Sequence, residues 1–219
     1  LPFLNRSGDA AMQSYSDIIP ELLLNEMIGR EGLVPLDPMS FQTDIKNAVG
    51  EPFNPHHPRF LAVLERGHID YVITGWYTKS PEGFLLFSHV LNARGDVAFS
   101  PMVPFSAPSG LSKACRALFA QIADALHVTD QVKQDASLKP WMGQGMHNLE
   151  AQRLFLQAKQ AIYRGENARD HLIETLEKDS TFVAARVWLI SGLMGTDRTE
   201  ATRHYRILQR QRFDELFVA

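Results

Sequence analysis

Apolar and polar positions follow two different patterns along the chain, and the change comes near residue 128. Before it, runs that alternate with a period of two stand between runs with helical spacing, which predicts strands mixed with helices. After residue 147 only helical spacing remains. We therefore predict an α/β domain with a mixed sheet over residues 1–130, a polar linker over residues 131–147 and an all-helical domain over residues 148–219.

The first domain is expected to hold a mixed sheet covered by helices. The chain opens with an apolar run typical of a buried strand, and three later runs alternate as in an antiparallel meander. Proline and glycine residues separate the runs. Strands are expected at residues 1–4, 32–38, 69–78, 84–93 and 97–106, and helices at residues 17–28, 39–50, 58–67 and 109–128.

Within the second domain, four residue pairs match at a spacing of 34 residues. They are Ala151 with Ala185, Phe155 with Leu189, Ala158 with Gly192, and Ile173 with Ile207. This spacing is the period of the tetratricopeptide (TPR) repeat, in which two helices pack as a hairpin. The pattern predicts two such repeats and a third that is truncated at the end of the chain. Two ordinary helical hairpins are the alternative.

The opening motif and the later hairpin resemble a known family. The residues that carry the resemblance are Leu1, Pro2, Phe3, Asn5, Ser7, Gly8, Asp9, Asp17, Glu21 and Leu22 near the start, and Gly67, Tyr71, Val72, Gly75, Leu91, Ala93 and Gly95 later. On these motifs the chain resembles the TolB-like N-terminal domain that precedes TPR repeats in many bacterial regulatory proteins. The resemblance extends over nearly the whole chain.

The resemblance implies a non-catalytic protein–protein interaction or sensor module of a larger bacterial signalling protein. In its most specific form, this is the periplasmic, extracytoplasmic sensor region of an inner-membrane Ser/Thr kinase. The alternative is a cytoplasmic ligand- or partner-binding effector domain of a transcription regulator or adenylate cyclase. A protein or peptide partner is expected, a homo-oligomer is compatible with the resemblance, and membrane anchoring is expected only through parts outside this chain.

Composition and charge are those of an ordinary globular protein. The 219 residues carry a net charge of −3, and 45% of them are hydrophobic, which is ordinary for a globular protein. Neither domain has the basic excess typical of nucleic-acid-binding proteins, so no nucleic acid partner is expected. The one cysteine, Cys115, rules out an internal disulfide but does not decide the compartment.

Three short features raise the question of catalysis or metal binding. Residues 5–9 lack the lysine and the additional glycines of a phosphate-binding loop, and a capped turn accounts for them. His56 and His57 with Asp44 offer too few ligands for a zinc site. Cys115 lies on the apolar stripe of its helix, where a buried small side chain is expected. We therefore expect no catalytic residue, no cofactor and no metal.

Two groups of residues are candidates for partner binding. Trp76 and Tyr77 follow each other in a strand, and an aromatic side chain that is left out of the core can contact a partner. Arg203, Arg206 and Arg210 share one face of a helix and can bind an acidic peptide or a phosphate. The alternatives are a core role for the aromatic pair and a solvated helix face for the arginines. The groove between the domains and the concave face of the repeats are the expected binding surfaces.

Overall fold

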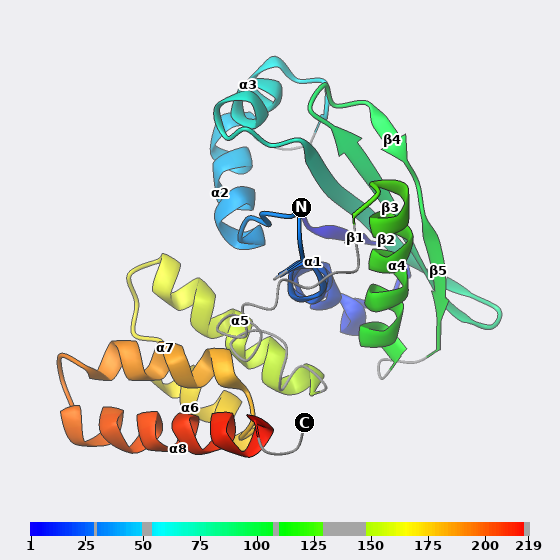
Figure 1. The fold of residues 1–219 in the computed structure, drawn as a ribbon. Coiled ribbons are helices and arrows are strands. Elements are labelled where there is room, and N and C mark those ends of the chain that lie inside the picture. Colours follow the sequence, from blue (N-terminus) through cyan, green and yellow to red (C-terminus); the bar gives the residue numbers. More distant parts are fainter. Residues whose placement is uncertain (29, 50–53, 107–109, 129–147, 217–219) are drawn as a thin grey trace. The chain divides into compact units, whose positions relative to one another are not determined.

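The computed structural model describes residues 1–28, 30–49, 54–106, 110–128 and 148–216, with side chains up to residue 210. The chain divides into two compact units, Leu1–Lys133 and Gln134–Ala219 (Figure 1). The described part of the first unit is mixed α/β and that of the second is helical, so the coarse fold class is confirmed. The predicted linker at residues 131–147 and the predicted start of a third repeat lie outside the described residues.

A five-stranded mixed sheet forms the centre of the first unit. Its middle is a long antiparallel hairpin of β2 (Tyr71–Ser80) and β3 (Gly83–Asn92). The short strand β1 (Phe3–Asn5) pairs with β2 in parallel. On the other side of the hairpin, β4 (Val97–Phe99) and β5 (Met102–Phe105) both pair with β3. The predicted meander is therefore confirmed, although its third run forms two strands.

Proline explains this division of the third run. Pro101 lies between β4 and β5, and a proline has no backbone N–H to donate to a strand partner. Its carbonyl oxygen instead accepts a hydrogen bond from the Ser88 amide at 3.0 Å. The pairing also shifts register between Val90 and Leu91. The two short strands consequently pair with opposite ends of β3.

Helices pack on the two faces of the sheet unequally. α1 (Tyr15–Met27), which follows a 3₁₀ turn at Ala10–Met12, and α4 (Leu111–Ala125) pack against each other and cover one face (Figure 1). α2 (Pro38–Val49) and α3 (Pro58–Arg66) form a second pair. This pair covers one end of the opposite face, where Val72 and Leu91 share a core with Ile45, Phe60 and Leu64.

The strand expected at residues 32–38 does not form, and this prediction was wrong. Residues 33–37 are irregular, and the side chains of Val34 and Leu36 are 91% and 51% exposed. Two prolines in the segment, Pro35 and Pro38, have no N–H to donate to a neighbouring strand. The Asp37 carboxylate accepts hydrogen bonds from the amides of Met39 and Ser40, so helix capping has already begun at the end of the segment.

The described part of the second unit contains four helices in sequence: α5 (Leu149–Tyr163), α6 (Arg169–Lys178), α7 (Val183–Leu193) and α8 (Arg198–Leu216). Each packs on the next along the chain (Figure 1). The Asn148 side chain caps α5 by accepting hydrogen bonds from two amides of its first turn. None of the helices in the described ranges is long and apolar enough to cross a membrane.

The 34-residue spacing places α5 and α7 in equivalent positions of this helical stack. Ala151 and Ala185 are both fully buried, and Phe155 and Leu189 both lie in the shared core. The third pair differs, because Ala158 is buried whereas Gly192 is exposed. The helical hairpins are therefore present, and the assignment of these hairpins to the TPR family stays a prediction.

Candidate functional site

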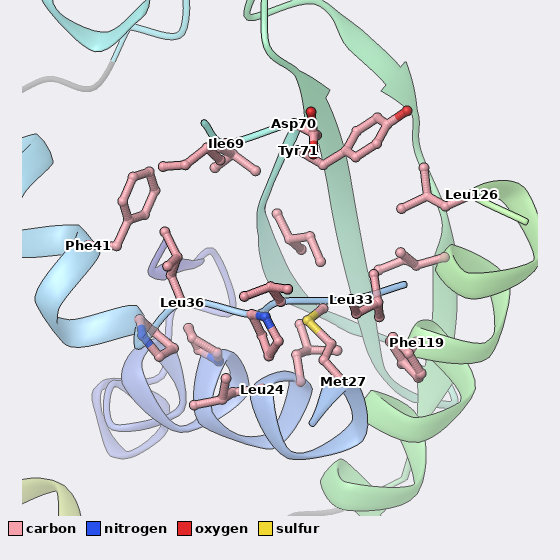
Figure 2. A pocket seen from close by; sticks show the side chains of 18 of the residues that line it. Leu24, Met27, Leu33, Leu36, Phe41, Ile69, Asp70, Tyr71, Phe119 and Leu126 are labelled. Carbon is pink, nitrogen blue, oxygen red and sulfur yellow. The ribbon is translucent and has the colours of Figure 1, made fainter. Parts of the chain in front are cut away.

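An apolar pocket lies in the first unit, on the face of the sheet that α1 and α4 cover (Figure 2). Its volume is about 610 Å³, within the range of about 300–1,000 Å³ that is usual for small-molecule sites. Leucine, isoleucine, valine, methionine and phenylalanine side chains make up most of its wall. Those that define its extent are Leu24 and Met27 of α1, Phe41 of α2, Ile69 before β2, and Phe119 and Leu126 at the end of α4.

The segment at residues 32–38 forms part of the pocket wall. Residues 32–38 run past the end of α1 without joining the sheet, and Leu33 lies in the middle of the pocket in Figure 2. Side chains of α1, α4 and β2 line the same space. Prolines and an early helix cap thus keep the segment out of the sheet, and its side chains form part of the pocket wall.

Polar groups lie at one end of the pocket. In Figure 2, Asp70 and Tyr71 lie at the start of β2, opposite Leu24 and Met27 of α1. Tyr71 is 48% exposed, so this end reaches solvent. The adjoining residue His68 has a φ of +50°, a conformation that is uncommon outside glycine and that forms the tight turn from α3 into β2. An apolar interior with a polar rim is the usual design of a site that binds and orients a ligand.

The two aromatic candidates Trp76 and Tyr77 lie on opposite faces of the sheet. Tyr77 is fully buried beneath α1. Its hydroxyl donates a hydrogen bond to the carbonyl oxygen of Met12 at 2.6 Å and lies 3.3 Å from Oγ of Ser16. Burial is the main reason why the pKa of Tyr77 is raised. Tyr77 is a core residue, and the prediction that it binds a partner is corrected on this ground.

Trp76 is partly exposed on the face that α1 and α4 do not cover. Strand pairing places it in a row across four strands, with Leu4 on β1, Phe87 on β3 and Met102 on β5. Its indole ring stacks on Phe87 with 5.0 Å between ring centroids. The guanidinium of Arg6 lies 4.7 Å from the indole centroid. Trp76 therefore remains a candidate, now as part of a larger surface.

The three arginine candidates lie exposed along α8. Arg203 bonds to the Glu200 carboxylate at 2.6 Å, so part of its charge is already balanced. All three arginines line a shallow depression of the helix surface together with Ile207. The structure thus brings the three together on one face, as expected, and pairs Arg203 with Glu200.

A scan against protein-family models matched none, and searches of the curated proteins and of the solved structures found no significant match. The resemblance to TolB-like domains with TPR repeats rests on the motifs alone and stays a prediction.

A buried polar cluster in the second unit was missed by the sequence analysis. Arg186 of α7 is 4% exposed; it donates hydrogen bonds to the Ser180 carbonyl oxygen and, over 3.1 Å, to Nδ1 of His204. Because arginine has only donors, Nδ1 must accept, and Nε2 of His204 lies 3.2 Å from the Glu200 carboxylate. Burial and then the charge of Arg186 lower the pKa of His204. The only sequence signal was the Glu200–His204 spacing of four residues on α8.

The loop at residues 5–9 is a capped turn. Oδ1 of Asn5 accepts a hydrogen bond from the Ser7 amide at 3.0 Å, and Oδ1 of Asp9 accepts one from the Ala11 amide at 3.0 Å. Gly8 has a φ of +73°, which glycine adopts without steric cost. The hydrogen bond from the Ala11 amide, together with the ion pair to Lys79 at 3.3 Å, lowers the pKa of Asp9. The polar side chains of this loop therefore stabilise the turn itself.

The cysteine and histidine candidates also have structural roles. Cys115 is fully buried, and burial raises the pKa of its thiol well above the ordinary value, so the reactive thiolate is disfavoured. Nδ1 of His57 accepts a hydrogen bond from the Arg59 amide and caps α3. In the part of the chain that the structure describes, no group of three or more His, Cys, Asp or Glu side chains is placed to hold a metal.

Proposed function

We propose that this chain is a non-catalytic sensor module whose first unit binds a small apolar molecule. The pocket between α1, α4 and the start of β2 is the observation that supports this function. It combines a volume suited to one small ligand with a wall of aliphatic and aromatic side chains. Transfer of an apolar ligand from water to such a wall is favourable in proportion to the apolar area that is buried.

The polar rim specifies more of the ligand's chemistry. Asp70 and Tyr71 line the pocket at the start of β2, and in Figure 2 their oxygens lie at its outer end, on the side away from Leu24 and Met27. A ligand with an apolar body and one hydrogen-bonding end, a hydroxyl or an amine, satisfies both parts of the pocket. An apolar molecule that carries a carboxylate at that end would meet Asp70, a group of like charge.

The wider setting of the module rests on the motif resemblance alone. It suggests the periplasmic sensor region of a membrane Ser/Thr kinase, and the alternative is an effector domain of a transcription regulator or adenylate cyclase. The pocket is compatible with both. The exposed arginines Arg206 and Arg210 favour a second, separate role for the helical unit, which is to bind an acidic peptide of a partner protein.

The test is a titration of the full chain with N-phenyl-1-naphthylamine, a neutral apolar probe whose fluorescence rises when it leaves water. We expect saturable binding of one probe per chain. Leu24→Trp fills the pocket from α1 and is expected to weaken binding at least tenfold. Leu4→Trp makes the same change at a position that is 58% exposed on the other face and is expected to leave binding unchanged.

Met27→Gln provides a second variant in case Leu24→Trp disturbs folding. It keeps the length of the side chain, places an amide in the apolar wall and is expected to weaken probe binding as well. Thermal unfolding of each variant identifies losses that come from unfolding. Non-saturable binding, or equal binding by all three variants and the parent chain, would contradict the proposed function.

A further inference from the structure

A second surface of the first unit lies on the face of the sheet that α1 and α4 leave open. Its centre is the row of Leu4, Trp76, Phe87 and Met102, which are direct partners across four neighbouring strands. Leu4 and Met102 at the ends of the row are 58% and 47% exposed. We call these four residues together with Arg6 the open-face row. Large apolar side chains in contiguous, solvent-accessible positions are typical of interaction surfaces.

The central rings of the open-face row are held in place. Trp76 stacks on Phe87 at 5.0 Å, with an interplanar angle of 12°. On the same strand as Phe87, His89 lies with its ring centroid 5.0 Å from that of Trp76, and its Nδ1 lies 2.7 Å from Oγ of Ser100. Side chains that are already ordered lose little conformational entropy when a partner binds. The row is therefore pre-organised for contact.

The charge of this surface points to the kind of partner. Arg6 lies over Trp76 and has no carboxylate partner among the described residues. The carboxylate of Asp9, three residues further along the chain, is bonded by Lys79 and by the Ala11 amide. An arginine beside an aromatic ring at the border of an apolar surface can form a charge-assisted hydrogen bond with an incoming carboxylate.

Two other occupants fit less well. A second copy of this chain would bring another Arg6 and no carboxylate from the same row, so the charges would not be complementary. A single-stranded nucleic acid needs free aromatic faces for its bases, whereas the indole of Trp76 is already covered by Phe87 and Arg6. A helix is the element that commonly packs on the face of a sheet, as α1 and α4 do on the other side.

We propose that the open-face row docks an amphipathic helix of a partner protein, with apolar side chains on the row and an acidic residue that bonds to Arg6. This inference is independent of the pocket, which lies on the opposite face of the sheet. Under this proposal, one face of the sheet binds a small molecule and the other face binds a protein.

The test uses the full chain and two synthetic 16-residue helical peptides. Both carry leucines along one face; one has glutamates at the flanking positions and the other has lysines. Isothermal titration is expected to show binding of the glutamate peptide and binding at least tenfold weaker for the lysine peptide. Arg6→Glu is expected to reverse this preference, an effect that a loss of structure would not produce.

Arg94→Glu is the matched control, because it makes the same charge change at an exposed turn outside the row. It is expected to leave the preference unchanged, whereas Met102→Asp is expected to abolish binding of both peptides. The inference is overturned if Arg6→Glu and Arg94→Glu behave alike. It is also overturned if vesicles of phosphatidylglycerol bind at this row and the peptides do not, or if sedimentation shows a dimer of the chain that Met102→Asp dissociates.

Discussion

The two faces of the central sheet carry similar side chains in matching positions, but those on one face are buried and those on the other are partly or largely exposed. On one face Tyr77, Leu86 and Val103 lie side by side on β2, β3 and β5, and all three are buried under helices. On the other face the next residues, Trp76, Phe87 and Met102, also lie side by side and are left partly or largely exposed. The rows are one residue apart along each strand.

This difference shows that the packing of helices on a sheet face, rather than residue type, decides which aromatic and aliphatic residues form the core. Successive strand residues point to opposite faces, so an apolar run gives both faces apolar side chains. α1 and α4 then bury one of them, and α2 and α3 reach only the end of the other at Val72 and Leu91. The rest of that face stays accessible to solvent and is available for binding.

The largest effect is expected from truncation of the buried aromatic side chain. Tyr77→Ala should lower the free energy of unfolding by about 3–5 kcal/mol, because it leaves a cavity under α1 and removes the hydrogen bond to Met12. Trp76→Ala on the open face should cost only about 1 kcal/mol. Equilibrium urea unfolding of the full chain measures both.

Tyr77→Phe tests the buried hydrogen bond of Tyr77 separately from the cavity. It removes only the hydroxyl, so it leaves the buried carbonyl oxygen of Met12 with one partner fewer, and it should cost about 1 kcal/mol. Equal losses for Trp76→Ala and Tyr77→Ala would show that the two faces are covered alike.

A glycine on the covered face gives the next largest effect. A methyl group at Gly75 would meet the backbone carbonyl of Phe87 and approach the ring of Phe3 to 2.6 Å. Gly75→Ala should therefore lower the free energy of unfolding by about 2–3 kcal/mol. Gly192→Ala in α7 is the control: no heavy atom lies within 4 Å of the added methyl, and the variant should gain up to about 1 kcal/mol. A harmless Gly75→Ala would contradict the close packing of Phe3 on β2.

The smallest effect is expected at a partly buried carboxylate in α1, one of the helices that cover the sheet. Burial raises the pKa of Asp17 in α1, so the folded protein holds this proton more tightly than the unfolded chain. The ionised carboxylate therefore opposes folding at pH 7, and this cost disappears as the pH falls through the folded pKa. Asp17→Asn should be the more stable protein at pH 7, and the parent chain should approach it as the pH is lowered. Urea unfolding measures the difference in stability between the two proteins, and a difference that widens as the pH falls would contradict this expectation.

Most elements of the fold could be predicted from the sequence, because their apolar periods are strong. The stripe of Leu111, Cys115, Leu118 and Ile122 predicts α4, and alternation predicts the long hairpin of β2 and β3. The strand predicted at residues 32–38 does not form, because its two prolines and the cap at Asp37 outweigh its hydrophobicity.

The candidate sites were less predictable, because they depend on tertiary packing. Alternation separates Trp76 from Tyr77, but it does not tell which face receives α1. The pocket is lined in part by the irregular residues Leu33 to Leu36, and no motif marks such a space. The contact of Arg186 with His204 joins two helices, and only the packing of α7 on α8 brings these residues together. The exposed arginines of α8 were found because helical spacing alone defines their face.

On this model of the sheet, the covered face binds an apolar ligand and the open face does not. A nuclear magnetic resonance titration of the full chain with N-phenyl-1-naphthylamine tests this most directly. The methyl signals of Met27 and Leu24 are expected to shift saturably, with the same dissociation constant as the fluorescence titration, and the signal of the Trp76 indole N–H is expected not to shift. A shift of the Trp76 indole with unmoved Met27 and Leu24 methyls would contradict both expectations.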